Sequence, residues 1–296
     1  MNHAFSIKIP HNYRCADFLA FHQRDSQMIA EQVQNKSLIK GIMWQGQPAK
    51  LQINFQKNRA DIKLNTTNTL NFELEKFQAS IERMLGLQQN VKEFEAKFSD
   101  HPRLGLLIKK NPGLRVAVTS TPYEAIAWAI IGQQISLSAA ISIRRRFIKL
   151  AGIQQASGLW CYPDEYCVIN ITEEQLRSAG FSKAKANTIL MLSNHLVAQK
   201  IDLNNLKPNT ESVAQLSDQL MQIRGIGPWT INYALLRGLG WLDGSLHGDV
   251  AVRRSLQTLL GANDKISEKE TQQWLLDFSP WRALVAAHLW EMHKQN

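Results

Sequence analysis

The feature that most constrains this chain is a tight glycine turn between two apolar helical stretches. Residues 220–236 read LMQIRGIGPWTINYALL, so an apolar helix end runs into Gly225 and Gly227, and a second helix begins at Pro228. Proline suits the first position of a helix, where its missing N–H group has no partner to lose. The two glycines allow the turn to expose backbone N–H groups beside a helix N-terminus, an arrangement that attracts phosphate. The pattern predicts a helix–hairpin–helix over about residues 216–237, although the glycines alone equally fit a plain turn between helices.

A carboxylate that lies twenty residues beyond Trp229 makes the functional interpretation more specific. Asp249 follows a glycine-rich loop and opens the apolar and basic run 250–254. An aspartate at the start of a helix is an ordinary cap for the first backbone N–H groups. The same side chain can also face a cleft, so Asp249 is a candidate for both roles.

Four ordered motifs connect these residues with a known family. In chain order, the four motifs are GQQIS (132–136), the hairpin with its Trp-Thr-x-x-Tyr continuation (229–233), Asp249, and a C-terminal pair formed by PWR (280–282) and HLW (288–290). Together they resemble the helix–hairpin–helix DNA glycosylases, and more closely the monofunctional 3-methyladenine DNA glycosylase II branch. The resemblance covers about residues 120–290 and is weaker toward the N-terminus.

The hydrophobic periodicity divides the chain into an N-terminal α/β unit and a helical remainder. Alternating apolar residues predict strands over 5–9, 37–44, 49–55 and 60–64, with helices over 17–21 and 72–87. We therefore expect a small α/β domain over residues 1–88, which by resemblance is like half of a TATA-binding protein. The remaining residues, 89–296, are expected to form an all-helical glycosylase core. The predicted fold class is α+β and mostly helical, with core helices over 91–98, 103–109, 123–131, 136–147, 173–179, 183–199, 213–223, 249–260, 267–278 and 281–293.

Composition narrows the class of protein. Hydrophobic residues make up 44% and charged residues 20% of the 296 residues, which is typical of soluble globular proteins. The net charge of +9 favours a polyanionic partner, either nucleic acid or an anionic membrane surface. No stretch has the pattern of a membrane span or a secretory signal. The three cysteines form no CxxC pair and none follows Cys167, so we expect no iron–sulfur cluster and a cytoplasmic, intracellular protein.

By resemblance, a pocket for an extruded base falls on four aromatic residues. Trp229, Tyr233 and Trp290 are expected to stack on the base, and Phe18 is expected to add a wall from the N-terminal domain. The residue that fills the gap left in the duplex falls on Gln134, where the best-known members of the branch have leucine. Two alternatives stay open: aromatic residues at helical spacing more often pack in a core, and a glutamine pair can simply end a helix.

The hairpin is expected, by resemblance, to hold the DNA backbone. Backbone N–H groups around Gly225 and Gly227, with the hydroxyl of Thr230, would bind a phosphate. Arg224 stands where many relatives have proline, and it can also contact phosphate. A monovalent cation, Na⁺ or K⁺, is expected on the main-chain carbonyls of Met221, Ile223 and Ile226.

Position 229 decides which mechanism the resemblance implies. Bifunctional relatives carry a lysine there that attacks the sugar and forms a Schiff base, whereas this chain has Trp229, so we expect no lyase activity. Cleavage then needs water and a carboxylate. Asp249 is expected to stabilise the oxocarbenium-like sugar and to orient or deprotonate the water. Because His247 and Gly248 replace a proline and a second aspartate of close branch members, no neighbouring carboxylate is expected to assist.

These observations predict a monofunctional DNA glycosylase. It would extrude alkylated purines of the 3-methyladenine type from double-stranded DNA and hydrolyse the N-glycosidic bond in base excision repair. We expect no redox or organic cofactor, no membrane and no obligate protein partner. Two alternatives keep the fold: action on deaminated bases, and a non-catalytic DNA-binding module that has no use for Asp249. A basic RNA-binding protein is disfavoured because no RNA-recognition motif is present.

Overall fold

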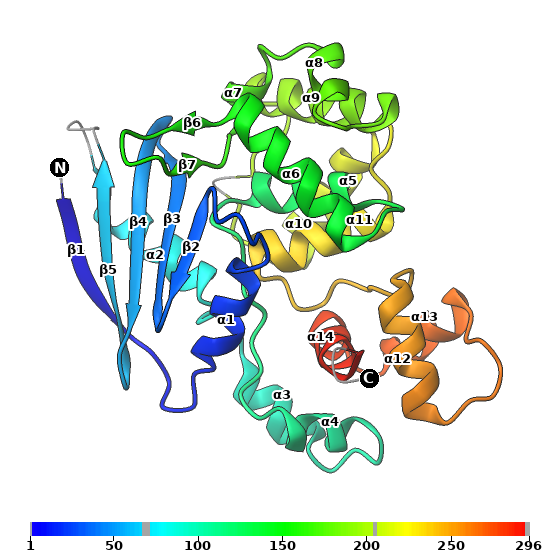
Figure 1. The fold of residues 1–296 in the computed structure, drawn as a ribbon. Coiled ribbons are helices and arrows are strands. Elements are labelled where there is room, and N and C mark those ends of the chain that lie inside the picture. Colours follow the sequence, from blue (N-terminus) through cyan, green and yellow to red (C-terminus); the bar gives the residue numbers. More distant parts are fainter. Residues whose placement is uncertain (1, 67–71, 204–205, 294–296) are drawn as a thin grey trace.

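The computed structural model describes residues 2–66, 72–203 and 206–293 and consists of a sheet beside two groups of helices (Figure 1). The strands are β1 (Asn2–Lys8), β2 (Glu31–Gln34), β3 (Ser37–Trp44), β4 (Gln47–Phe55), β5 (Arg59–Thr66), β6 (Ile153–Gln154) and β7 (Trp160–Cys161). The helices up to the hairpin are α1 (Cys15–His22), α2 (Leu74–Met84), α3 (Val91–Phe98), α4 (Leu104–Lys110), α5 (Pro122–Gly132), α6 (Leu137–Ala151), α7 (Glu165–Val168), α8 (Glu173–Ser178) and α9 (Lys183–Val197). The remaining helices are α10 (Thr210–Met221), α11 (Pro228–Ala234), the π-helix η1 (Leu235–Leu239), α12 (Val250–Leu260), α13 (Glu268–Leu276) and α14 (Arg282–His293).

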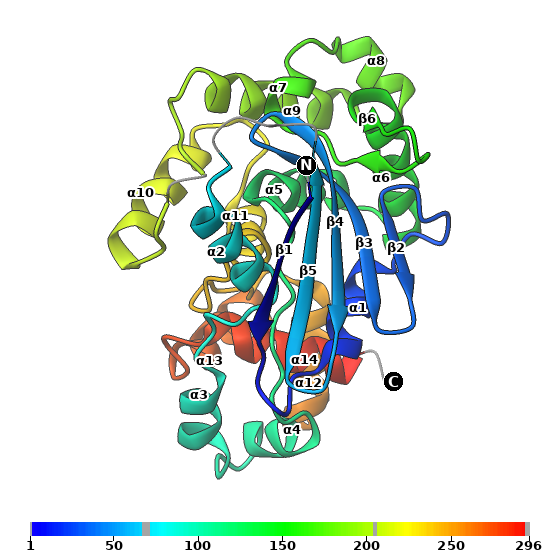
Figure 2. The same cartoon turned by 90° about the vertical axis from the view of Figure 1, so that its left-hand side faces the viewer.

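The N-terminal sheet has the strand order β1-β5-β4-β3-β7-β6, with β2 paired to β3 (Figures 1 and 2). Strand β4 shows why it forms: its alternate residues Ala49, Leu51, Ile53 and Phe55 are buried while those between them are not. This period of two places one apolar face of the strand against the core. The buried face packs with side chains of α1 and α2 in one hydrophobic cluster. The predicted α+β class is thus confirmed, as are the four predicted strands.

The expectation that no strand follows residue 88 is wrong. Strands β6 and β7 add two residues each to the N-terminal sheet, and β7 runs parallel to β3 through the pair Gly41 and Cys161. A side chain at Gly41 would bring its Cβ to 2.1 Å from the carbonyl oxygen of Trp160, so glycine permits this close approach. Sequence patterning also missed β2. Strands of two to four residues are too short to show a period of two, and only their partners make them strands.

The helical part contains two hydrophobic clusters. Helices α5, α6 and α8–α11 contribute to the first, and α3, α4 and α12–α14 contribute to the second. Helix α5 lies inside the first cluster: its residues 122–131 are all buried, and the Thr121 hydroxyl caps its first turn by accepting from the Glu124 N–H group. A division of the chain near residue 88 stays a prediction. Helices α3 and α4, which follow this residue, pack with C-terminal helices, as the division requires, but β6 and β7 cross it by joining the N-terminal sheet.

A buried group of charges joins the sheet to α5 and α6. Lys40 of β3 donates to Glu31 and, over 2.8 Å, to Glu124 of α5. Arg144 of α6 lies 3.0 Å from Glu31 and 3.1 Å from Glu124. Burial acts to raise the pKa of Glu31, but Arg144 and Lys40 outweigh it and hold that pKa well below its usual value. Two cations and two carboxylates thus compensate one another where the sheet meets the helices.

No helix within the described residues is both long enough and apolar enough to cross a membrane.

Candidate active site

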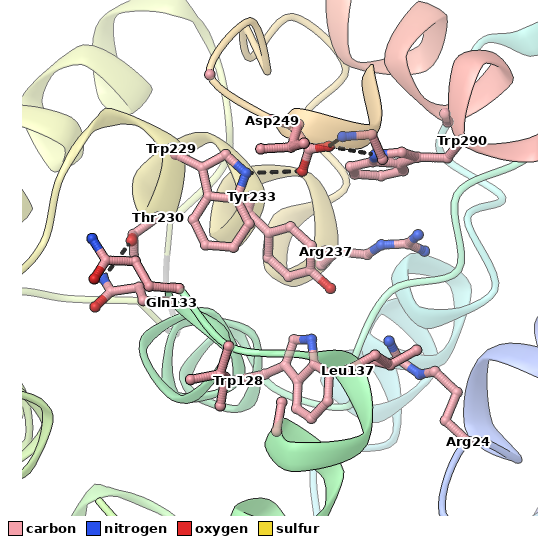
Figure 3. A pocket seen from close by; sticks show the side chains of 18 of the residues that line it. Arg24, Trp128, Gln133, Leu137, Trp229, Thr230, Tyr233, Arg237, Asp249 and Trp290 are labelled. Carbon is pink, nitrogen blue, oxygen red and sulfur yellow. Dashed lines mark hydrogen bonds between the residues drawn. The ribbon is translucent and has the colours of Figure 1, made fainter. Parts of the chain in front are cut away.

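A cleft of about 1730 Å³ lies where the two helical clusters meet. The end of α1, helix α5 with the loop that follows it, the hairpin, and helices α12 and α14 all contribute to its walls. Figure 3 shows Asp249 flanked by Trp229 and Trp290, with Trp128, Leu137 and Arg24 on the opposite side. Residues from both ends of the chain therefore line one cavity.

Asp249 is the N-cap of α12 and also lines this cleft, so both roles foreseen for it are realised in one position. Its Oδ1 atom accepts from the backbone N–H groups of Ala251 (2.9 Å) and Val252 (3.1 Å) and from the indole N–H of Trp290 (3.2 Å). Its Oδ2 atom accepts from the indole N–H of Trp229 (3.0 Å). These four donors fix the direction of the carboxylate.

Three of the four predicted base-binding aromatics meet beside this carboxylate. The ring centroids of Trp229 and Tyr233 are 5.4 Å apart, and those of Tyr233 and Trp290 are 6.2 Å apart. All three side chains are only partly buried and line the cleft. The two indoles therefore combine an apolar wall with a hydrogen bond to Asp249.

The structure corrects the expectation for Phe18. This side chain is only 2% exposed and packs against Phe55 in the core of the N-terminal domain, so it does not line the cleft. Phe21, three residues later on the same helix, lines the cleft instead. The sequence alone does not reveal which side of α1 faces the sheet, and that orientation decides between the two phenylalanines.

Two arginines that the sequence analysis did not single out also line the cleft. The Arg24 guanidinium carbon lies 4.1 Å from the ring centroid of Phe21 and 4.9 Å from that of Trp128. The corresponding Arg237 carbon lies 4.7 Å from Phe21 and 5.4 Å from Trp290. Rings and guanidinium groups thus alternate along the cavity. Burial lowers the pKa of Arg237 to about 10, so the group remains charged at neutral pH.

The hairpin has the turn that its glycines predict. Gly225 adopts a φ of +96°, and a Cβ there would lie 2.2 Å from the Thr188 hydroxyl oxygen. Gly227 is the N-cap of α11 and lines the cleft; a Cβ there would meet no atom of the described residues within 4 Å. Gly225 therefore serves the fold, whereas Gly227 leaves the backbone open to an approaching group.

Gln134 is exposed at the cleft with a φ of +56°, in the loop between α5 and α6. Its neighbour Gln133 points to the hairpin instead, where Nε2 donates to the Gly225 carbonyl and to the Thr230 hydroxyl, each over 2.9 Å. Thr230 lines the cleft but is only 2% exposed, and its hydroxyl anchors the loop by accepting from Gln133. Its expected contact with a phosphate stays a prediction.

The fold, the hairpin and the aspartate together define a helix–hairpin–helix DNA glycosylase. The model of the HhH-GPD superfamily of base excision DNA repair proteins matches residues 127–280, and that of the AlkA N-terminal domain matches residues 5–120. The chain belongs to the HhH-GPD superfamily. The family and the enzyme class predicted from the sequence are thus confirmed, and membership in a DNA repair family makes DNA the partner of this protein.

Proteins with similar sequences are named as DNA-3-methyladenine glycosylases. DNA-3-methyladenine glycosylase of Bacillus subtilis (strain 168) is 27% identical over 220 residues, which cover 72% of this chain and 70% of the relative. DNA-3-methyladenine glycosylase 2 of Escherichia coli (strain K12) is 26% identical over 191 residues, which cover 63% of each chain. The chain thus spans roughly two thirds of the length of these relatives.

Solved structures share the fold. The 3-methyladenine DNA-glycosylase from Archaeoglobus fulgidus superposes with a TM-score of 0.81 at 20% identity, covering 98% of both chains. The Schizosaccharomyces pombe 3-methyladenine DNA glycosylase Mag1, solved in complex with abasic DNA, superposes with a TM-score of 0.58 at 23% identity, covering 68% of this chain and 97% of that one. The first likeness extends over the sheet as well as the helices.

Proposed function

We propose that this protein is a monofunctional DNA glycosylase that removes alkylated purines of the 3-methyladenine type and leaves an abasic site. The observation that carries the proposal is Asp249, whose carboxylate lies at the cleft between the indoles of Trp229 and Trp290. The names of the relatives support the choice of lesion. A non-catalytic DNA-binding module would have no need for this arrangement.

The mechanism follows from the position of this carboxylate. The damaged nucleotide leaves the duplex and enters the cleft, and Gln134 fills the space that it vacates. As the N-glycosidic bond breaks, its electron pair leaves with the base, and the negative charge of Asp249 stabilises the cationic sugar. A water molecule then adds to C1′ and loses a proton, for which Asp249 is the acceptor.

The residue at position 229 supports hydrolysis without strand cleavage. A lyase of this family needs an amine at this place to form a Schiff base, and Trp229 has none to offer. Its indole N–H donates to Asp249 instead. The product we expect is therefore a free base and an intact strand with an abasic site.

The aromatic wall favours alkylated purines. N-alkylation makes the base a cation in DNA and a good leaving group, and a cation is attracted to the faces of indole and phenol rings. Trp229, Tyr233 and Trp290 supply three such rings beside the catalytic carboxylate. The shape of the cleft and cation–π attraction can thus select the alkylated base. Because this base is already a good leaving group, its release needs no dedicated general acid.

Arg24 and Arg237 favour a second candidate, the removal of deaminated bases. Both guanidinium groups face the same cleft, and their N–H groups match a neutral base with a carbonyl oxygen better than a cationic one. Hypoxanthine, from deaminated adenine, has such an oxygen. The two candidates share the fold, the hairpin and Asp249, and they differ only in the lesion.

The proposal includes a monovalent cation on the main-chain carbonyls of Met221, Ile223 and Ile226. Carbonyl oxygens suit such hard cations. The Ile223 carbonyl accepts from the Ile226 N–H group over 3.0 Å, which leaves its second lone pair for an ion. The site would brace the hairpin and take no part in bond cleavage.

We propose that the protein acts in the cytoplasm of a bacterial-type cell, on the DNA of that cell.

The function is tested with a panel of duplexes under single-turnover conditions. One carries 3-methyladenine, one 7-methylguanine, one hypoxanthine, and one no lesion. We expect base release from both methylated duplexes and no strand cleavage until alkali is added. Faster release of hypoxanthine than of either methylated base would favour the second candidate, and release from no duplex would contradict both.

A further inference from the structure

Helix α9 contacts both of the loops that border the cleft. The Lys185 ammonium group donates to the Ile131 carbonyl over 2.8 Å and to the Gln133 carbonyl over 2.7 Å. These carbonyls belong to the C-terminal end of α5 and the start of the loop that carries Gln134. A cation at the C-terminal end of a helix also interacts favourably with the helix dipole.

One turn further along α9, Thr188 holds the hairpin. Its hydroxyl donates to the Arg224 carbonyl over 2.9 Å, and its oxygen occupies the space beside Gly225 where a Cβ would lie. Thr188 is buried, so this contact lies inside the protein. The same helix therefore fixes the loop through Lys185 and the phosphate-facing turn through Thr188.

A third contact closes the arrangement. The Gln133 side chain donates to the Gly225 carbonyl, so the loop also binds the hairpin directly. Gln134 is left as the residue between these anchors, exposed and in a left-handed conformation that a non-glycine residue adopts at a cost. Such a conformation persists when its surroundings hold it, and Lys185 supplies two of the hydrogen bonds that do so.

We propose that Lys185 is a positioning residue for base extrusion, which acts by holding Gln134 at a fixed distance from the hairpin that binds the DNA backbone. The inference rests on the proposed glycosylase function. Lys185 lines the cleft without forming part of its aromatic wall. Its effect should therefore fall on the separation of the base pair and leave cleavage of an extruded nucleotide unchanged.

Two duplexes distinguish these steps. In one, the methylated base faces its normal partner, so extrusion leaves an orphaned base that Gln134 must accommodate. In the other, it faces an abasic analogue, so the pair is already broken while the DNA backbone is still present for the hairpin. We divide the single-turnover release rate on the paired duplex by the rate on the duplex with the abasic analogue. This ratio reports the contribution of the loop and is insensitive to the amount of active enzyme.

The variant is Lys185→Met, and the matched control is Lys183→Met, which removes the same charge from an exposed position of the same helix. We expect Lys185→Met to lower the ratio about tenfold, the effect of one charge-assisted hydrogen bond, while Lys183→Met leaves it unchanged. Lys185→Arg, which keeps a donor and a charge, should restore much of the ratio. A melting temperature close to that of the wild type confirms that the variant is folded.

A double-mutant cycle identifies the residue through which Lys185 acts. Gln134→Ala should lower the same ratio, and Lys185→Met should then add little to it. Equal slowing on both duplexes by Lys185→Met, or fully additive effects in the cycle, would overturn the inference. Absence of base release by the wild type from either duplex would instead contradict the proposed function.

Discussion

At the scale of single residues, the orientation of the carboxylate that we propose to be catalytic depends on its hydrogen-bond donors. Two backbone N–H groups hold Asp249 as a helix cap would, but the indoles of Trp229 and Trp290 reach it from two other helices. An N-cap alone needs neither. The indole donors fix the orientation of this carboxylate. In the mechanism that we propose it would lie beneath the sugar as the bond breaks, and preorganised contacts of this kind are a main source of catalytic stabilisation.

The Trp290 donor can be removed while an aromatic ring is kept. We expect Trp290→Phe to slow base release roughly tenfold, because a net hydrogen bond to a charged group contributes about 1.5 kcal/mol or more. DNA affinity should change little. Trp274→Phe is the control, since Trp274 packs on Phe278 outside the cleft. Equal rates for both variants, measured by single-turnover release from methylated duplex, would show that the donor to Asp249 is not used.

The sequence predicted the residues around Asp249 because their chemistry and order are distinctive. It could not predict Phe21 in place of Phe18, since both lie on one short apolar helix. Arg237 was missed for a different reason. It lies on the π-helix η1, which widens the helix after α11, and such a turn has no simple sequence pattern.

At the scale of elements, the two hairpin glycines have separate physical reasons to be glycine. Gly225 has a positive φ and lies against the buried Thr188, whereas Gly227 has a φ of −116° and faces open space among the described residues. A single sequence motif thus contains one residue needed for folding and one that exposes backbone. The same substitution should affect them differently.

We expect Gly225→Ala to lower the free energy of unfolding by about 1–3 kcal/mol, because the methyl group requires both a strained φ and movement of Thr188. Gly227→Ala should leave stability within about 0.5 kcal/mol and weaken DNA binding roughly tenfold, since its methyl group would stand where we expect a phosphate to approach. Urea denaturation and fluorescence anisotropy measure the two effects. Similar losses of stability in both variants would refute this division of roles.

Elements with a long apolar period or a clear cap were predictable. Helix α5 follows a Thr-Pro start and is apolar throughout, and α12 follows Asp249, so local residues specify both. Strand β7 depends on a partner, β3, that lies more than a hundred residues away, and β6 joins the sheet only by pairing with β7. The missed elements are all short: β6, β7 and β2 have two to four residues, and helix α7 has four.

At the scale of the whole molecule, buried charges fix the sheet against the helices that form the cleft. Lys40 is fully buried between Glu31 and Glu124. We expect Lys40→Met to lower the free energy of unfolding by about 3–5 kcal/mol, because it leaves two buried carboxylates, Glu31 and Glu124, with Arg144 as their one remaining cation. The control, Lys63→Met, removes an exposed lysine of the same sheet. A comparably small effect of both changes in urea denaturation would contradict this account.

Buried histidine makes stability depend on pH. His288 packs against Phe94, and burial lowers its pKa from 6.5 to about 3. The unfolded chain therefore takes up the proton first, so the stability from neutral His288 is complete above pH 6.5 and is lost as the pH falls toward 3. Between pH 6 and 4 the free energy of unfolding of His288→Phe should fall less steeply, by about 1 kcal/mol per pH unit, than that of the wild type. His11→Phe, at an exposed position, should keep the wild-type slope; a wild-type slope in His288→Phe would contradict the assignment.

The most direct test of the account compares wild type with Asp249→Asn on a duplex that contains 3-methyladenine. The change keeps a side-chain oxygen and removes the negative charge, so we predict release of the base to fall by a factor of about 10²–10³ while affinity for DNA with an abasic analogue is retained. Release at the wild-type rate by Asp249→Asn would show that this carboxylate does not stabilise the sugar cation, and would contradict the central claim.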